Sequence, residues 1–176
     1  MVWLELPPVR LNRGGMSERD PLQYRPCVGA MMVNGSGQVF VGKRIDNKEG
    51  DWWQMPQGGV DPGEDPDKAV LRELAEEAGV QESQLELLVR LPEELFYDLP
   101  DTLQGKLWGG KYKGQRQTWY LVRYTGTDAE IVLDSHHDPE FCEFRWVEPD
   151  LLPELIVPFK REVYQAVVDG FRDKMG

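Results

Sequence analysis

Short apolar stretches separated by turn residues run along the chain and predict a β-sheet. Two of them, Cys27–Val33 and Gln38–Arg44, flank the run Asn34-Gly35-Ser36-Gly37. Such a run between two alternating stretches is typical of a hairpin turn. Further stretches of strand length, rich in β-branched and aromatic residues, are Leu85–Leu91, Gln117–Tyr124 and Glu143–Val147.

Two other stretches have a helical pattern. Pro66–Ala78 follows Asp65, which can cap a helix, and precedes Gly79, which suits a left-handed C-terminal position. In 159–171, apolar residues recur every four positions and form one stripe. Because strands and helices mix along the chain, we expect one α/β domain over residues 24–176.

Residues 1–23 show no sustained period and predict an irregular N-terminal arm. A short disordered arm and translation that begins at Met16 are both compatible with this sequence. The arm also lacks the continuous apolar core of a secretory signal.

The predicted helix 66–78 carries a cluster of carboxylates. At about 100° per residue, Glu73, Glu76 and Glu77 fall within an arc of roughly 100°. Apolar residues on a neighbouring arc (Val70, Leu71, Leu74 and Ala78) can face the core. Two interpretations follow: a solvated acidic face, or a site where Mg²⁺ or Mn²⁺ sits among oxygen ligands and relieves the repulsion.

Composition narrows the classes of function. The net charge of −11 disfavours broad coating of DNA or RNA, which requires a basic surface. No apolar run approaches the roughly 20 residues of a membrane span. The two cysteines are far apart and outside any paired motif, which indicates free thiols in a reducing compartment. We therefore expect a cytoplasmic protein, and we expect it to be a monomer.

The segment 58–80, GGVDPGEDPDKAVLRELAEEAGV, resembles the Nudix box G-x5-E-x7-R-E-U-x-E-E-x-G-U, where U is apolar. Every fixed position matches, which makes the motif far more specific than a lone glycine pattern. Flanking segments (YRPCVG, WWQMPQGG, GQRQTWYLVR, EFCEFRW and PFKREVY) are similar to one Nudix subgroup. That subgroup contains the bacterial RNA 5′-pyrophosphohydrolases and the plant-type asymmetric diadenosine tetraphosphate hydrolases.

The resemblance implies a fold and a set of site residues. The fold is an α/β/α sandwich with a mixed central sheet. The implied metal site comprises Glu73, Glu76, Glu77, Glu64, Glu140 and Gly58, and the ion is Mg²⁺ or Mn²⁺. Glu140 either binds metal or acts as general base, and Arg72 orients the carboxylates as an ion-pair partner.

Substrate contacts are expected on both sides of the box. Cations for the non-reacting phosphates are Arg25, Lys43, Arg44, Lys160 and Arg161, and the resemblance favours Arg25, Arg44 and Lys160. The resemblance also places Gln57, Tyr97 and Phe159 in the substrate site, the last two as surfaces for a base. Phe159 lies on the apolar stripe of 159–171 as well, so core packing is the alternative there.

The sequence predicts metal-dependent hydrolysis of a phosphoanhydride and leaves the substrate open. The acidic balance and the LWGG stretch at 107–110 favour diadenosine tetraphosphate, cut to ATP and AMP. The alternative is an RNA 5′-pyrophosphohydrolase, which releases pyrophosphate from triphosphorylated transcripts. A non-catalytic nucleotide-binding module is disfavoured because every box carboxylate is present.

Overall fold

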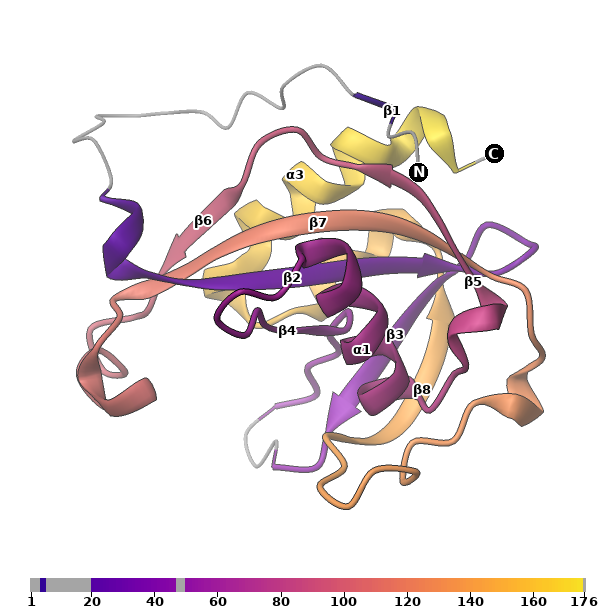
Figure 1. Cartoon of the computed structure of the whole chain (residues 1–176), viewed down its shortest axis with the longest axis horizontal. Coiled ribbons are helices and arrows are strands. Elements are labelled where there is room, and N and C mark those ends of the chain that lie inside the picture. The colour runs from indigo at the N-terminus through magenta and orange to yellow at the C-terminus, as the bar shows by residue number, and fades with distance from the viewer. Residues whose placement is uncertain (1–3, 6–19, 47–49, 176) are drawn as a thin grey trace.

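One mixed sheet with helices on both faces forms the protein (Figure 1). The computed structural model describes residues 20–46 and 50–175 and the backbone of residues 4–5. The strands are β1 (Leu4–Glu5), β2 (Tyr24–Val33), β3 (Val39–Arg44), β4 (Gln57–Gly59), β5 (Leu85–Arg90), β6 (Leu95–Asp98), β7 (Gly114–Tyr124) and β8 (Phe141–Val147). The helices are α1 (Pro66–Ala78), α2 (Leu152–Leu155) and α3 (Arg161–Phe171).

The sheet order is β1-β5-β7-β2-β3-β8, with β4 paired to β2 and β6 paired to β7. The long strands β2 and β7 run parallel along their whole length. On its other edge β2 forks: β4 pairs antiparallel with Cys27–Gly29, and β3 pairs only at Val33↔Val39. This fork leaves room for β4 and the loop that leads into α1.

The two faces of the sheet bury separate cores. On one face, alternate β2 residues such as Val28 and Met32 pack with Val70 and Leu74 of α1. On the other face, Trp119 of β7 packs with α2, α3 and neighbouring strands. In Figure 1 α1 lies in front of the sheet and α3 lies behind it. The expected α/β/α sandwich with a mixed sheet is therefore confirmed.

The predicted elements are present with small shifts at their ends. Helix α1 has the predicted bounds: the side chain of Asp65 accepts a hydrogen bond from Asp67 N, and Gly79 is left-handed with φ 66°. The second predicted helix starts later, because 158–160 forms a 3-10 turn before α3. Strand β6 and helix α2 were not predicted, because each is only four residues long.

Most of the predicted irregular arm over residues 1–23 lies outside the described residues, and two short elements are described within it. Leu4–Glu5 form β1, which pairs in parallel with β5, and Pro21–Gln23 form a 3-10 turn capped by Asp20. Met16 lies outside the described residues. No helix in the described part of the chain is both long enough and apolar enough to cross a bilayer.

Gly29 generates a prediction about stability. A Cβ at this position would lie 2.6–2.7 Å from ring atoms of Trp119, which is fully buried and cannot move aside. We expect Gly29→Ala to destabilise the protein by about 1–3 kcal/mol through overpacking, measured by urea denaturation. Gly35→Ala is the control, because no atom lies within 4 Å of a Cβ there. Equal midpoints for the two variants would contradict this account of the core.

Candidate active site

The loop between β4 and α1 folds back along the helix and brings Glu64 to it. Asp61 N donates to the Glu64 carboxylate at 3.0 Å, which holds the turn closed. Arg72 then binds both oxygens of Glu64, with Nε–Oε2 at 2.8 Å and Nη2–Oε1 at 2.9 Å. This paired contact, together with the Asp61 hydrogen bond, lowers the pKa of Glu64 to about 2. Glu64 is therefore fixed beside α1 as a carboxylate.

Arg72 connects the loop, the helix and β4. Its Nη1 donates to Glu73 at 2.9 Å and lies 3.4 Å from both oxygens of Glu76. Its Nη2 also donates to the carbonyl oxygen of Gly59 at 2.9 Å. One guanidinium thus balances three carboxylates, as expected of an orienting partner.

Glu73 lies directly against the backbone of Gly58. A Cβ at Gly58 would overlap the Glu73 carboxyl group, so a side chain at this position would displace it. Burial raises the pKa of Glu73 to about 7, with Arg72 opposing the shift and Glu76 adding to it. The first glycine of the box therefore makes space for a carboxylate at the edge of the sheet.

Glu77 is almost completely buried, with 3% of its surface exposed. Its Oε2 accepts a hydrogen bond from Gln57 N at 3.2 Å, and its buried Oε1 has no hydrogen-bond partner among the described residues. Burial, and then the nearby charges of Glu140 and Glu73, raise the pKa of Glu77 well above its usual range. A buried carboxylate with an unpaired oxygen is costly in a protein without a cation beside it.

Glu140 reaches the same cluster from outside the box. Its side chain is exposed, and its charge acts on both Glu77 and Glu73. Ile45 N donates to the Glu140 carbonyl oxygen at 2.9 Å, which ties this segment to the end of β3. Upstream, Val132 N donates to Ala78 O at 3.1 Å, which ties the preceding segment to the end of α1.

The donors of this cluster fit a hard divalent cation in kind, because all are carboxylate oxygens. In the arrangement described, no three acidic, histidine or cysteine side chains of the described residues converge closely enough to enclose an ion. The guanidinium of Arg72 instead stands between Glu64, Glu73 and Glu76. The assignment of these residues as metal ligands stays a prediction.

The predicted cations fall into two groups. Lys160 and Arg44 lie together near the carboxylates, and burial and the charge of Arg44 lower the pKa of Lys160 to about 8. Arg44 is held by both oxygens of Asp46 at 2.8 Å.

Lys43, by contrast, forms an ion pair with Asp51 at 3.1 Å, and Arg161 is exposed. Arg25 lies against Gly59.

The structure brings the two predicted base-contacting rings together. The centroids of Tyr97 and Phe159 are 5.7 Å apart, and Lys160 Nζ lies 5.3 Å from the Tyr97 centroid. Tyr97 is only 6% exposed and packs in the core, so its ring offers no open face for an adenine in this conformation. Phe159 is half-buried and is the more accessible of the two.

A glutamine network supports the carboxylates: Gln57 was predicted in the substrate site, whereas Gln115 and Gln117 were not predicted as part of it. Gln117 Nε2 donates to Gln57 and to Gln115, both at 2.8 Å, and Trp119 Nε1 donates to Gln117 at 3.0 Å. Since Gln57 N also binds Glu77, the network connects β7 to the carboxylate cluster. The signal available in the sequence was the alternation of Gln115, Gln117 and Trp119, which puts all three on one face of a strand.

Comparisons with known proteins show which proteins this chain is similar to. A family model described as the NUDIX domain matches residues 23–167. An RNA pyrophosphohydrolase of Novosphingobium aromaticivorans is 60% identical over 152 residues, which cover 86% of this chain and 94% of that protein. An RNA pyrophosphohydrolase of Erythrobacter litoralis is 56% identical over 158 residues, or 90% and 96% of the two chains.

Solved structures show the same fold at low sequence identity. The E. coli dihydroneopterin triphosphate pyrophosphohydrolase is similar with a TM-score of 0.66 at 19% identity, over 85% of this chain and 98% of that one. A C. elegans Ap4A hydrolase in a binary complex has a TM-score of 0.61 at 21% identity, with the same coverage.

The buried charge of Glu77 generates a prediction about pH. Because its pKa is raised in the folded state, the folded protein holds this proton more tightly than the unfolded chain. The contribution of protonated Glu77 to the free energy of unfolding is fully present below about pH 4.3, the pKa of an unperturbed glutamate. That contribution is lost as the pH rises toward the pKa of Glu77 in the folded protein. In EDTA at pH 8, we expect Glu77→Gln to raise Tm by about 2–4 °C, the shift that roughly 1 kcal/mol gives at this chain length.

The gain should shrink at pH 5, where the wild-type carboxyl is largely protonated, and thermal denaturation at the two pH values measures it. Glu82→Gln, at an exposed glutamate outside the cluster, should change Tm little at either pH. A gain for Glu77→Gln that is the same at both pH values would contradict the raised pKa.

Proposed function

The chain belongs to the Nudix hydrolase family, and we propose that it removes pyrophosphate from the 5′ end of triphosphorylated RNA. The observation that carries this proposal is the name shared by relatives that are 56–60% identical to the chain over nearly their whole length. They favour the RNA alternative over diadenosine tetraphosphate, which the acidic balance and the LWGG stretch had favoured. The Ap4A hydrolase structure is only 21% identical and supports the fold alone.

A phosphoanhydride resists water because its negative charge repels the nucleophile. In our proposal Glu73, Glu76 and Glu77 hold a divalent ion such as Mg²⁺ or Mn²⁺, with Glu64, Glu140 and Gly58 in support. The bound ion supplies neutralisation of phosphate charge and a lowered pKa for a water ligand. The fit rests on the unpaired buried oxygen of Glu77, on Glu73 packed against Gly58, and on a donor set made of carboxylates.

Residues of the chain orient the substrate and manage the proton. Arg44, Lys160 and Arg25 bind the phosphate oxygens that do not react, and Phe159 contacts a base. Glu140 accepts a proton from the attacking water because it is exposed beside the buried carboxylates. The water oxygen forms a bond to phosphorus, the anhydride bond breaks, and pyrophosphate leaves an RNA with a 5′-monophosphate. Attack is direct, so isotope-labelled water enters one product phosphate and no phosphoenzyme forms.

The proposed substrate is tested by a direct comparison of two substrates. Purified protein with Mg²⁺ is offered triphosphorylated RNA and diadenosine tetraphosphate separately, the products are identified, and kcat/KM is measured for each. We expect the higher kcat/KM for RNA, with pyrophosphate as the co-product. A higher value for diadenosine tetraphosphate, with ATP and AMP as products, would reverse the assignment.

The role of the carboxylates is tested by Glu76→Gln. The amide keeps the shape of the side chain but loses the charge that opposes the cation, so kcat should fall on the order of 1000-fold. Circular dichroism and Tm should stay close to wild type because Glu76 is partly exposed. Glu82→Gln, which removes an exposed carboxylate elsewhere, is the matched control. Retained activity in Glu76→Gln would refute its place in the site.

A further inference from the structure

The loop between β6 and β7 is basic in an otherwise acidic protein. Residues 99–116, which comprise this loop and the first three residues of β7, contain four Lys or Arg and one Asp, whereas the whole chain has 20 basic and 31 acidic residues. The four cations are Lys106, Lys111, Lys113 and Arg116. A local excess of cations on a molecule with a net charge of −11 is the electrostatic footprint of a polyanion contact.

Aromatic rings lie among these cations. Trp108 and Tyr112 pack edge to face with centroids 6.4 Å apart, and both are half-buried. Lys111 Nζ lies 5.2 Å from the Tyr112 centroid, and the Arg25 guanidinium lies 5.4 Å from the Trp108 centroid. Cations interleaved with partly exposed rings are the elements that bind single-stranded nucleic acid, where bases stack and phosphates pair.

The backbone at Trp108 is strained. Its φ is 52°, the only positive φ at a non-glycine among the described residues, and the next two residues, Gly109 and Gly110, have φ of 67° and 74°. A non-glycine residue in the left-handed region is uncommon, and such strain is seen where a side chain must be presented in a particular direction. Here that direction places the indole ring under Arg25.

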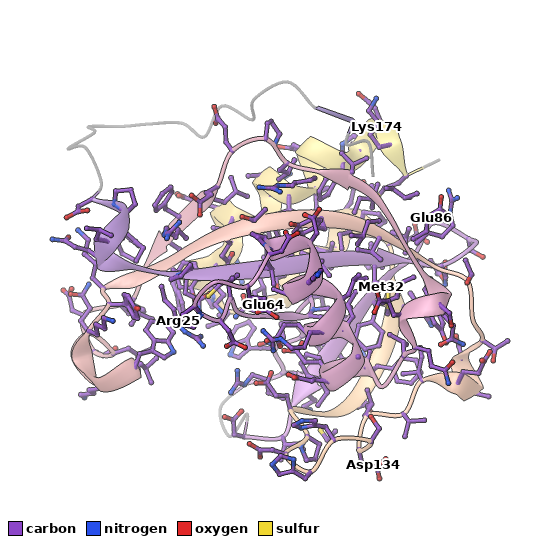
Figure 2. All side chains as sticks on the ribbon, in the orientation of Figure 1. Arg25, Met32, Glu64, Glu86, Asp134 and Lys174 are labelled. Carbon is purple, nitrogen blue, oxygen red and sulfur yellow. The ribbon has the colours of Figure 1, made fainter. Side chains whose placement is uncertain are left out.

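Arg25 connects this loop to the carboxylates. Its guanidinium lies against Gly59, whose carbonyl oxygen binds Arg72. A cleft of about 410 Å³ has Arg25 in its lining together with Glu64, Tyr112 and Arg116. Figure 2 shows Arg25 and Glu64 toward the same side of the molecule and Lys174 at the opposite end. A bound chain that extends from the carboxylates past Arg25 would therefore contact the β6–β7 loop next.

Arg116 adds a polar atom that the protein itself does not satisfy. Its Nη1 pairs with Glu94 at 3.1 Å, whereas its buried Nε has no hydrogen-bond partner among the described residues. Because a buried donor without a partner is costly, Arg116, which lines the cleft, carries a polar group that its described neighbours leave unsatisfied.

We propose that Trp108, Tyr112 and the lysines of the β6–β7 loop, which adjoin Arg25, form a surface that binds the RNA chain downstream of the reacting 5′ phosphates. We call it the downstream surface. The inference rests on the proposed function and adds to it a dependence on chain length. Phosphates and stacked bases beyond the second nucleotide contact the downstream surface, so a longer RNA binds better than a dinucleotide.

The test compares RNA of two lengths. 5′-Triphosphorylated oligonucleotides of two and ten residues are hydrolysed by wild type, by Lys106→Gln/Lys111→Gln, and by the control Arg123→Gln/Lys174→Gln, which removes two exposed cations elsewhere. The lysine variant should lose about 10-fold in kcat/KM on the ten-residue RNA and stay within about twofold on the dinucleotide. The control should match wild type on both.

A second variant addresses stacking. Tyr112→Ala should lower kcat/KM on the ten-residue RNA by about fivefold or more, with little effect on the dinucleotide. Raising the salt concentration should reduce the advantage of the longer RNA in wild type and should do so less in the lysine variant.

The outcomes separate the two proposals. If both RNAs are hydrolysed equally well by wild type and by the lysine variant, the downstream surface is refuted and the proposed function stands. If neither RNA is hydrolysed, the proposed function fails and the inference fails with it. If the lysine variant loses as much activity on diadenosine tetraphosphate as on the ten-residue RNA, the surface contacts a small ligand, and the chain-binding role is refuted.

Discussion

The contact between Arg72 and the surrounding carboxylates is the interaction on which the site depends. Glu64, Glu73 and Glu76 repel one another at short range, and one guanidinium offsets that repulsion while also binding the Gly59 carbonyl oxygen. Arginine is suited to this place because its planar group donates in several fixed directions. Without Arg72, the β4–α1 loop, α1 and β4 would lose the side chain that binds all three. The repulsion between the carboxylates would then be unopposed in the free protein.

The fork in the sheet explains why this cluster lies where it does. β2 pairs with β4 at Cys27–Gly29, near its middle, and with β3 only at its end, so the two partner strands diverge along this edge of β2. Because Gly58 has no side chain, the Glu73 carboxylate can pack directly against β4. Gln57 N of the same strand donates a hydrogen bond to Glu77. The parallel pairing of β2 with β7 makes the opposite wall rigid. The site is thus built at a break in regular pairing and supported by the most regular part of the sheet.

Most of the fold follows from local signals that the structure confirms. Helix α1 could be bounded to the residue because its cap, its proline and its terminal glycine all act within a few positions. The four-residue elements β6 and α2 could not be predicted from the sequence, because tertiary packing decides whether elements that short form. Within the site, the helix wheel placed the three box glutamates together, but Glu140 came only from resemblance. The glutamine network depends on which strands become neighbours, which no local pattern records.

The positions of Glu77 and Glu140 are fixed at separate points. Val132 N binds Ala78 O directly after Glu77, and Ile45 N binds the Glu140 carbonyl oxygen. The stretch 133–139 connects these two fixed positions, and within it Leu133 packs against the core and Ser135 lies beside Gly79. Residues 136–139, which follow, can change in length or composition without disturbing the chemistry, because the entropic cost of loop closure grows only slowly with length. Sequence changes in this protein can accumulate there. A new binding loop could be inserted at this point while Glu77 and Glu140 keep their positions.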